Sequence, residues 1–171
     1  MPMIPFVKTF PELGVRETRS VKVNGTPDLP DGEYGFIESY CNERGCDCRR
    51  VIISVIRPET GWSRVLATIG YGWESLEFYQ EWSRGPVDPK EVGIPYLDVL
   101  NPQSEYSSAL LGIFEFLLES PDYVERIKRH YRMFRDAVEK EHGRPAAFET
   151  NRAENRRKRL RDPRRRGRRS H

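Results

Sequence analysis

The sequence has few histidines, few cysteines and no long apolar run, and these shortages exclude several classes of protein. It has 171 residues, three histidines and three cysteines. No apolar segment approaches the roughly 18–20 residues that span a bilayer, and the N-terminus lacks the basic start and apolar stretch of a signal peptide. Neither a phosphate-binding glycine loop nor a Gly-x-Ser-x-Gly nucleophile motif is present. We therefore expect a cytoplasmic protein without a membrane segment, and no motif predicts an enzyme.

Positive charge is concentrated at the C-terminal end. Residues 152–171 hold 11 of the 29 Lys and Arg residues and two of the 26 Asp and Glu residues, so this end carries +9 and the rest of the chain −6. Because such a segment cannot bury a core, we expect a globular domain over residues 1–145 and a disordered arginine-rich tail over residues 146–171. Basic segments bind RNA or DNA by releasing counterions from phosphates; the alternative is a tail that only solubilises. The candidate nucleic-acid or ribosome contacts are Arg156, Arg157, Lys158, Arg159, Arg164, Arg165, Arg166, Arg168 and Arg169.

The order of the predicted elements favours an α+β fold. Residues 1–15 look irregular, whereas segments 16–23, 33–40, 49–57 and 62–71 have the composition of short strands. Their short connections predict an antiparallel meander of three to four strands. Residues 74–82 predict a short helix, Asn101-Pro102 the start of a helix to residue 119, and Ser120-Pro121 the start of another to residue 141. Strands followed by helices predict a sheet covered on one face by the C-terminal helices.

All three cysteines fall within eight residues, at the predicted reversal between two strands. They form the pattern Cys41-x4-Cys46-x-Cys48, with Gly45 in the turn. In an extended Cys-x-Cys segment both side chains leave the same face, and Cys41 can approach from the opposite arm. Thiolates that converge in this way suit a tetrahedral Zn²⁺ ion. The sequence therefore predicts a zinc site at this bend.

A structural zinc site needs a fourth ligand, and His130 is the candidate because it lies beside the apolar stripe of the last predicted helix. Other interpretations of the cysteines remain open. They can pack as small buried apolar groups, or the Cys46-x-Cys48 pair can act as a thiol redox enzyme or switch, with the pKa of the thiols lowered by neighbouring arginines. For the chain as a whole, a further possibility is a protein-interaction adaptor that uses the aromatic surface or the acidic body. The leading hypothesis is a non-enzymatic zinc-binding protein.

Five segments of the chain carry a resemblance to other proteins: Gly32–Cys41, Cys46–Val51, Ala67–Glu74, Asn101–Ser104 and Arg129–Tyr131. They resemble segments of an uncharacterised bacterial family of small proteins with a Cys-x4-Cys-x-Cys cluster. The resemblance covers residues 30–135. Because that family has no assigned activity, the resemblance implies no function.

Overall fold

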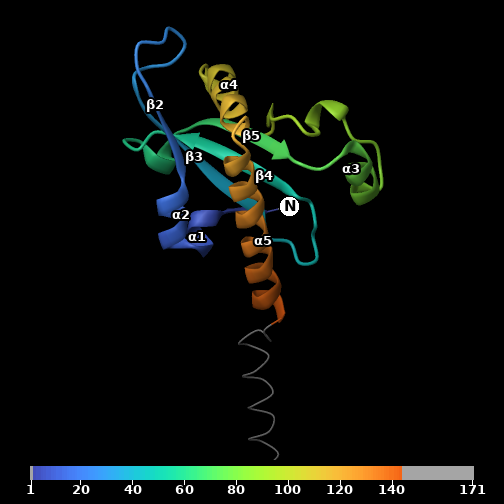
Figure 1. Cartoon of the computed structure of the whole chain (residues 1–171). Helices are drawn as coiled ribbons and strands as arrows, with labels where there is room; N and C mark the ends of the chain where they lie inside the picture. Colours follow the sequence, from blue (N-terminus) through green and yellow to red (C-terminus); the bar gives the residue numbers. More distant parts are fainter. Residues whose placement is uncertain (1, 144–171) are drawn as a thin grey trace, which may run out of the picture.

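The computed structural model describes residues 2–143 and has the α+β architecture that the sequence predicts (Figure 1). A six-stranded antiparallel sheet precedes two longer C-terminal helices. Short helical turns at Gly61–Ser63 and Pro89–Glu91 interrupt the connections. The remaining elements are β1 (Met3–Pro5), α1 (Phe6–Thr9), α2 (Pro11–Glu17), β2 (Arg19–Val23), β3 (Gly32–Cys41), β4 (Arg50–Ile56), β5 (Val65–Gly72), α3 (Leu76–Ser83), β6 (Tyr96–Leu97), α4 (Ser107–Leu118) and α5 (Pro121–Gly143).

The sheet is a meander built around the long strand β3. The strand order is β1-β3-β4-β5-β6, and β2 pairs with the same edge of β3 as β1 does. β2 pairs along the first half of β3, from Gly32 to Phe36, and β1 pairs along its last three residues, from Ser39 to Cys41. The end of β3 that carries Cys41 is therefore held between two strands, β1 and β4.

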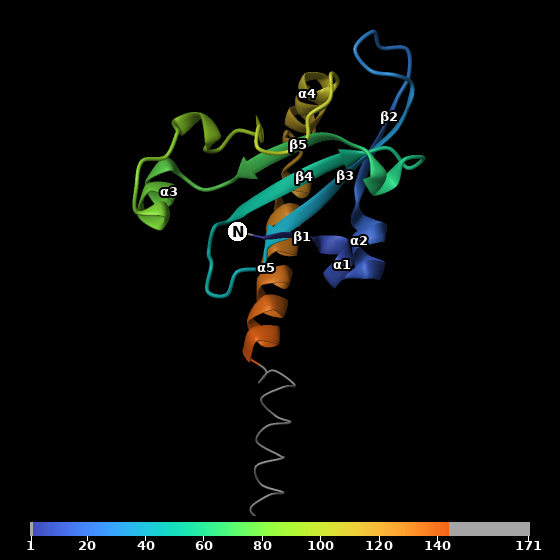
Figure 2. The ribbon, with the colours of Figure 1, turned by 180° about the vertical axis from the view of Figure 1, so that it is seen from behind.

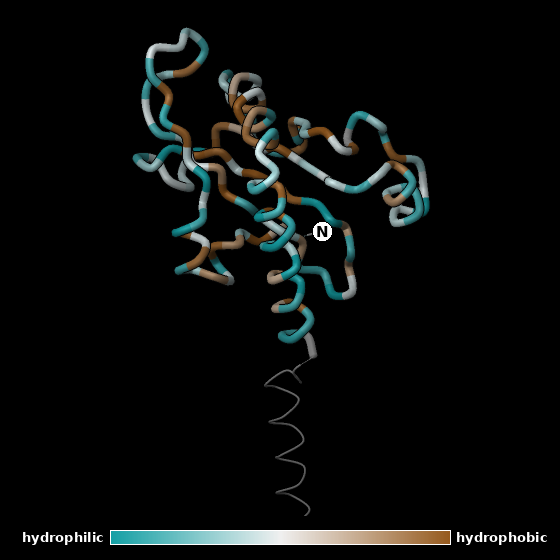
Figure 3. Tube along the Cα trace, viewed as in Figure 1, coloured by the Kyte–Doolittle hydropathy of each residue, from teal (hydrophilic) through white to brown (hydrophobic). Residues whose placement is uncertain are grey.

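The two faces of the sheet differ in what covers them. α5 crosses one face (Figure 1), and Phe36 on β3 stacks on Phe114 of α4 at 6.2 Å between ring centroids. Hydrophobic residues gather along the central strands (Figure 3), as expected for a sheet packed against helices. Seen from behind, the opposite face has neither α4 nor α5 across it (Figure 2). Alternation along β4 places Val51 and Ile53 on the covered face and Arg50 and Ile52 on the other.

The structure corrects the predicted fold in several places. Residues 1–15 are not irregular, because they form β1, α1 and α2, and the sheet has six strands rather than three to four. The strand predicted for residues 16–23 starts only at Arg19, after α2 ends at Glu17. These N-terminal elements are three to seven residues long, too short to leave a periodic pattern in the sequence.

The helix predicted from Asn101-Pro102 begins at Ser107 instead. The side chain of Gln103 explains the delay, because its Oε1 accepts from the backbone N–H of Thr68 at 3.2 Å and its Nε2 donates to the Thr68 carbonyl at 2.7 Å. This pair of bonds imitates a neighbouring strand and holds the chain against β5. The last helix runs over Pro121–Gly143 and confirms its predicted start. Among residues 2–143, no helix is both long enough and apolar enough to cross a membrane.

Candidate metal centre

The three cysteines lie on one strand end and the loop that follows it. Cys41 is the last residue of β3, and Cys46 and Cys48 lie in the loop before β4. Gly45 has a φ of 69°, a left-handed conformation that suits glycine, and it lets the loop reverse tightly. Arg49 also adopts a positive φ of 45° and turns the chain into β4. These two left-handed residues bracket the Cys46-x-Cys48 pair and turn it back toward the end of β3.

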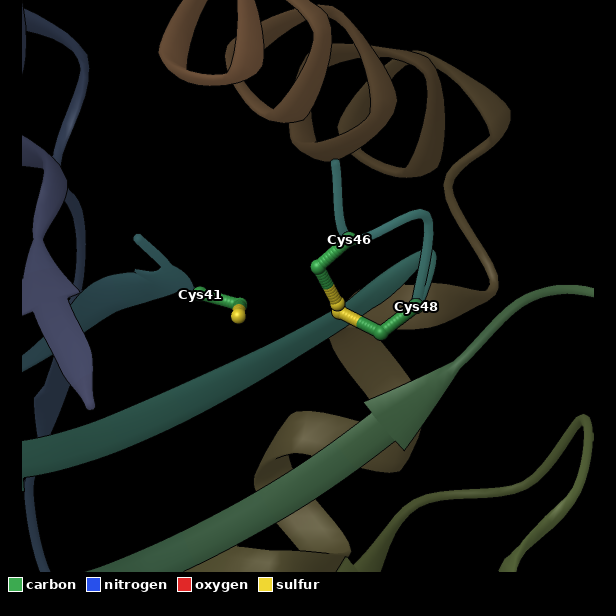
Figure 4. A group of neighbouring side chains, drawn as sticks. All are labelled: Cys41, Cys46 and Cys48. Carbon is green, nitrogen blue, oxygen red and sulfur yellow. The ribbon is translucent and has the colours of Figure 1, made fainter. Parts of the chain in front are cut away.

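The sulfur atoms of all three cysteines lie within 4.8 Å of one another. Cys41 reaches toward the pair from β3, and Cys46 and Cys48 meet it from the loop (Figure 4). Cys41 and Cys48 are buried, Cys46 is partly exposed, and none of the three is in a disulfide. The predicted convergence of the cysteines is thus confirmed, and the arrangement offers three soft donors to one metal ion.

Burial raises the pKa of the thiols of Cys41, Cys46 and Cys48. The predicted lowering of the thiol pKa by neighbouring arginines is therefore wrong. One reason is that Arg49 is engaged elsewhere, since its guanidinium pairs with Asp47 at 2.9 Å and with Glu74 at 3.2 Å. Thiols with a raised pKa keep their protons at neutral pH and are weakly reactive as nucleophiles.

Helix α5 clamps the cysteine loop with residues spaced four apart. The Tyr131 hydroxyl donates to Asp47 Oδ1 at 3.0 Å and accepts from the backbone N–H of Arg49 at 3.3 Å. Arg135 Nη1 donates to the Cys41 carbonyl at 2.8 Å. Glu139 Oε1 accepts from the backbone N–H of Gly45, also at 2.8 Å.

Residues four apart lie on one face of a helix, so one side of α5 holds the loop at three points. The sequence analysis missed these supporting residues, and the spacing of 131, 135 and 139 is the signal that could have found them. A loop fixed in this way loses less freedom when it binds an ion, which favours binding.

The structure does not bring His130 to the sulfurs. Its Nδ1 lies 2.7 Å from Glu38 Oε2 and its Nε2 lies 2.9 Å from Glu17 Oε2, so both ring nitrogens face carboxylates. The ring is buried and stacks on Phe6 at 4.1 Å between centroids. His130 is therefore a packing and hydrogen-bonding residue that joins α5 to α2 and β3, and its assignment as a fourth ligand is not supported. Within residues 2–143, no other His, Asp or Glu completes the three-cysteine group.

The predicted nucleic-acid contacts, from Arg156 to Arg169, lie outside the described residues, as does the whole of the proposed tail. Comparisons of the chain with models of protein families, with curated proteins and with solved structures gave no match. The case for a function therefore depends on the local geometry of the cysteine cluster.

Proposed function

We propose that this protein binds one Zn²⁺ ion through the thiolates of Cys41, Cys46 and Cys48, and that the ion has a structural, non-enzymatic role. The observation that supports the proposal is that the three sulfur atoms lie within 4.8 Å of one another. Thiolates that bind one tetrahedral zinc at about 2.3 Å lie roughly 3.8 Å apart. A contraction of about 1 Å, within reach of side-chain torsions, then brings all three within bonding distance.

The position of the cluster supports a structural role. The ion would join the end of β3 to the loop that enters β4, and α5 already holds that loop through Arg135 and Glu139. A metal bound by the folded state only adds its binding free energy to stability. Water or a ligand atom from outside residues 2–143 would complete the coordination.

A thiol redox role of Cys46 and Cys48 is the second candidate, because both belong to the same close group. Reactive thiols in redox proteins have a lowered pKa, whereas burial raises the pKa of both thiols here. The measurement that separates the two functions is intact mass after mild oxidation. A loss of two hydrogen masses that a thiol reductant reverses would favour the redox role, whereas a stably metal-loaded protein that resists oxidation would oppose it.

Metal analysis of the full chain tests the main proposal. Purified under reducing conditions without chelator, the protein should contain about one equivalent of zinc. When Co²⁺ replaces zinc, it should give thiolate charge-transfer absorption and the intense visible bands of a tetrahedral ion. Less than about half an equivalent of any metal would refute the proposal.

Matched variants locate the ion. Cys48→Ser should lose most of the metal because a hydroxyl replaces one of three thiolates. Glu43→Gln is the control, since Glu43 is an exposed loop residue whose carboxylate makes no hydrogen bond or ion pair among those found in residues 2–143. Full metal content in Cys48→Ser would place the ion elsewhere.

We also propose that the arginine-rich end contacts nucleic acid or the ribosome. The net charge of +9 over residues 152–171 supports this role, because affinity for a phosphate backbone increases with the number of phosphates neutralised. The body of the chain, at −6, is an unsuitable partner for phosphate, so any such binding should depend on the basic end.

A further inference from the structure

A cleft of about 550 Å³ lies on the face of the sheet opposite α4 and α5, beside the candidate metal centre. Its volume falls within the roughly 300–1,000 Å³ typical of small-molecule sites. Figure 2 shows this face from outside, with β3, β4 and β5 exposed to view. Cys48 is one of the residues that line the cleft. The apolar and aromatic lining residues are Met3, Ile52, Val65, Trp62, Trp82 and Tyr96.

Two glycines of β5 let aromatic side chains pack directly on the strand. A Cβ at Gly70 would overlap the ring of Tyr96, and a Cβ at Gly72 would overlap the hydroxyl end of Tyr79. Tyr79 is also anchored by its hydroxyl, which donates to the Arg49 carbonyl at 2.8 Å. The walls of the cleft are therefore fixed by packing before any ligand binds.

Arg50 is the cation of this cleft. Its guanidinium carbon lies 4.4 Å from the centre of the Tyr79 ring and 5.6 Å from that of Trp82. Within residues 2–143 Arg50 forms no ion pair, and its buried Nε has no hydrogen-bond partner. A guanidinium held on aromatic faces without a carboxylate partner retains its capacity to bind an anion.

The other charged lining residue, Asp98, is already occupied. Its Oδ1 accepts from the backbone N–H of Leu100 at 3.1 Å, and its Oδ2 accepts from the Asn101 amide at 2.7 Å. It stabilises the loop after β6 and places one negative charge in the cleft. Arg50 is the single lining cation that can pair with an anion, and Asp98 repels further negative charge, so a ligand with one carboxylate fits the cleft better than a ligand with several negative charges.

We propose that this cleft binds a small aromatic carboxylate. The carboxylate pairs with the guanidinium of Arg50, and the ring packs against the indole of Trp82, which borders the same guanidinium. Ser39 and Ser54 add hydroxyl groups on the floor of the cleft. The inference does not depend on metal binding, because Arg50 and the tryptophans are not among the proposed ligands.

Titration of the full chain with indole-3-acetate tests the proposal, with calorimetry for affinity and ¹H–¹⁵N spectra for location. Indole-3-acetate should bind with a dissociation constant of about 1 mM or tighter, the range open to a ligand of this size. The largest spectral shifts should fall on β4, β5 and the indole N–H groups. The neutral amide, indole-3-acetamide, should bind about tenfold more weakly because it loses a charge-assisted bond.

Arg50→Gln should weaken indole-3-acetate binding about tenfold, whereas Arg64→Gln, at an exposed arginine outside the cleft, should leave it unchanged. Ser54→Leu fills the cleft without touching Arg50 and should also reduce binding, so the proposal remains testable if Arg50→Gln does not fold. The proposal would be overturned if Ser54→Leu bound indole-3-acetate as tightly as the unmodified chain, or if the unmodified chain did not bind it at about 10 mM. Spectral shifts that map to another part of the domain, or tighter binding of phenyl phosphate than of indole-3-acetate, would also overturn it. Measuring indole-3-acetate binding with and without added zinc shows whether it is independent of metal binding at the cysteines.

Discussion

At the scale of single residues, one arginine connects the candidate metal centre to the rest of the molecule. Arg135 donates to the carbonyl of Cys41 and pairs with Glu139 at 2.6 Å, and Glu139 in turn accepts from the loop at Gly45. Side chains that hold metal ligands in place affect affinity although they do not touch the ion. The cysteine backbone is thus positioned from α5 rather than by the loop alone.

Arg135→Gln should lower zinc affinity about tenfold, the lower end of the range seen when a supporting contact is removed. The loss follows from freeing the Cys41 carbonyl and the Glu139 carboxylate at the same time. Competition with a chromophoric chelator measures it. Arg132→Gln, at an exposed position of the same helix, should bind zinc as the unmodified chain does; equal affinity in both variants would show that Arg135 is not a support.

Zinc binding should release about three protons at pH 7, one from each thiol. Burial raises the pKa of all three cysteines, so in the metal-free protein the thiols still hold their protons at this pH. The apparent affinity should consequently rise with pH, by about a thousandfold per unit while three protons are displaced. Calorimetry in buffers of different ionisation enthalpy counts the protons, and release of about one or fewer would contradict coordination by three thiolates.

At the scale of elements, α5 organises two separate regions. Its second half holds the cysteine loop, and its middle holds the N-terminal segment, where His130 bridges Glu17 of α2 and Glu38 of β3. Arg129 adds an ion pair to Glu17. These bonds hold α2, and Phe6 of α1 stacks on the ring of His130. Both helices are too short to be stable in isolation.

Glu17→Gln should destabilise the fold by about 1 kcal/mol near neutral pH, at the low end for a bond to a charged group because Glu17 is partly exposed. Burial opposes ionisation, but the hydrogen bond from His130 and the charge of Arg129 lower the pKa of Glu17 in the folded state. A lowered folded pKa gives stability that is present above the unfolded pKa and is lost as the pH falls through the folded pKa.

Urea unfolding from pH 7 to pH 3 measures this contribution. The difference between the unmodified chain and Glu17→Gln should shrink as the pH drops below about 4. Glu12→Gln on the exposed side of α2 is the control and should follow the unmodified chain. A difference that is constant across this pH range would mean that the Glu17 carboxylate makes no favourable interaction in its ionised form.

The sequence was informative wherever local pattern decides the structure. Composition predicted the central strands, Ser120-Pro121 predicted the start of α5, and the spacing of Cys41, Cys46 and Cys48 predicted their convergence. The sequence was misleading where a residue far away along the chain determines the contacts of a side chain. His130 belongs to two carboxylates that lie 92 and 113 residues away along the chain, and no local spacing indicates such a choice of partner.

At the scale of the whole molecule, the chain separates its charge, with −6 over residues 1–151 and +9 over residues 152–171. The basic end should thus attract a polyanion such as nucleic acid, whereas the acidic remainder of the chain should repel it. Salt screens such interactions over about 10 Å at 0.1 M. Binding that depends on the basic end should therefore be sensitive to ionic strength.

Truncation at Ala147 tests this division. The full chain should bind a single-stranded RNA or a DNA duplex with an affinity that falls steeply from about 50 to 200 mM salt, because each phosphate contact releases a counterion. Without residues 147–171 the remaining chain is acidic, so binding and its salt dependence should both disappear, while the zinc content stays at one equivalent. Fluorescence anisotropy over a salt series supplies the slopes. If the truncated chain bound as tightly as the full one, the folded domain itself would have to bind phosphate. The surface to examine next would be the one beside the start of α5, which is formed by Arg19, Arg126, Arg129 and Arg132.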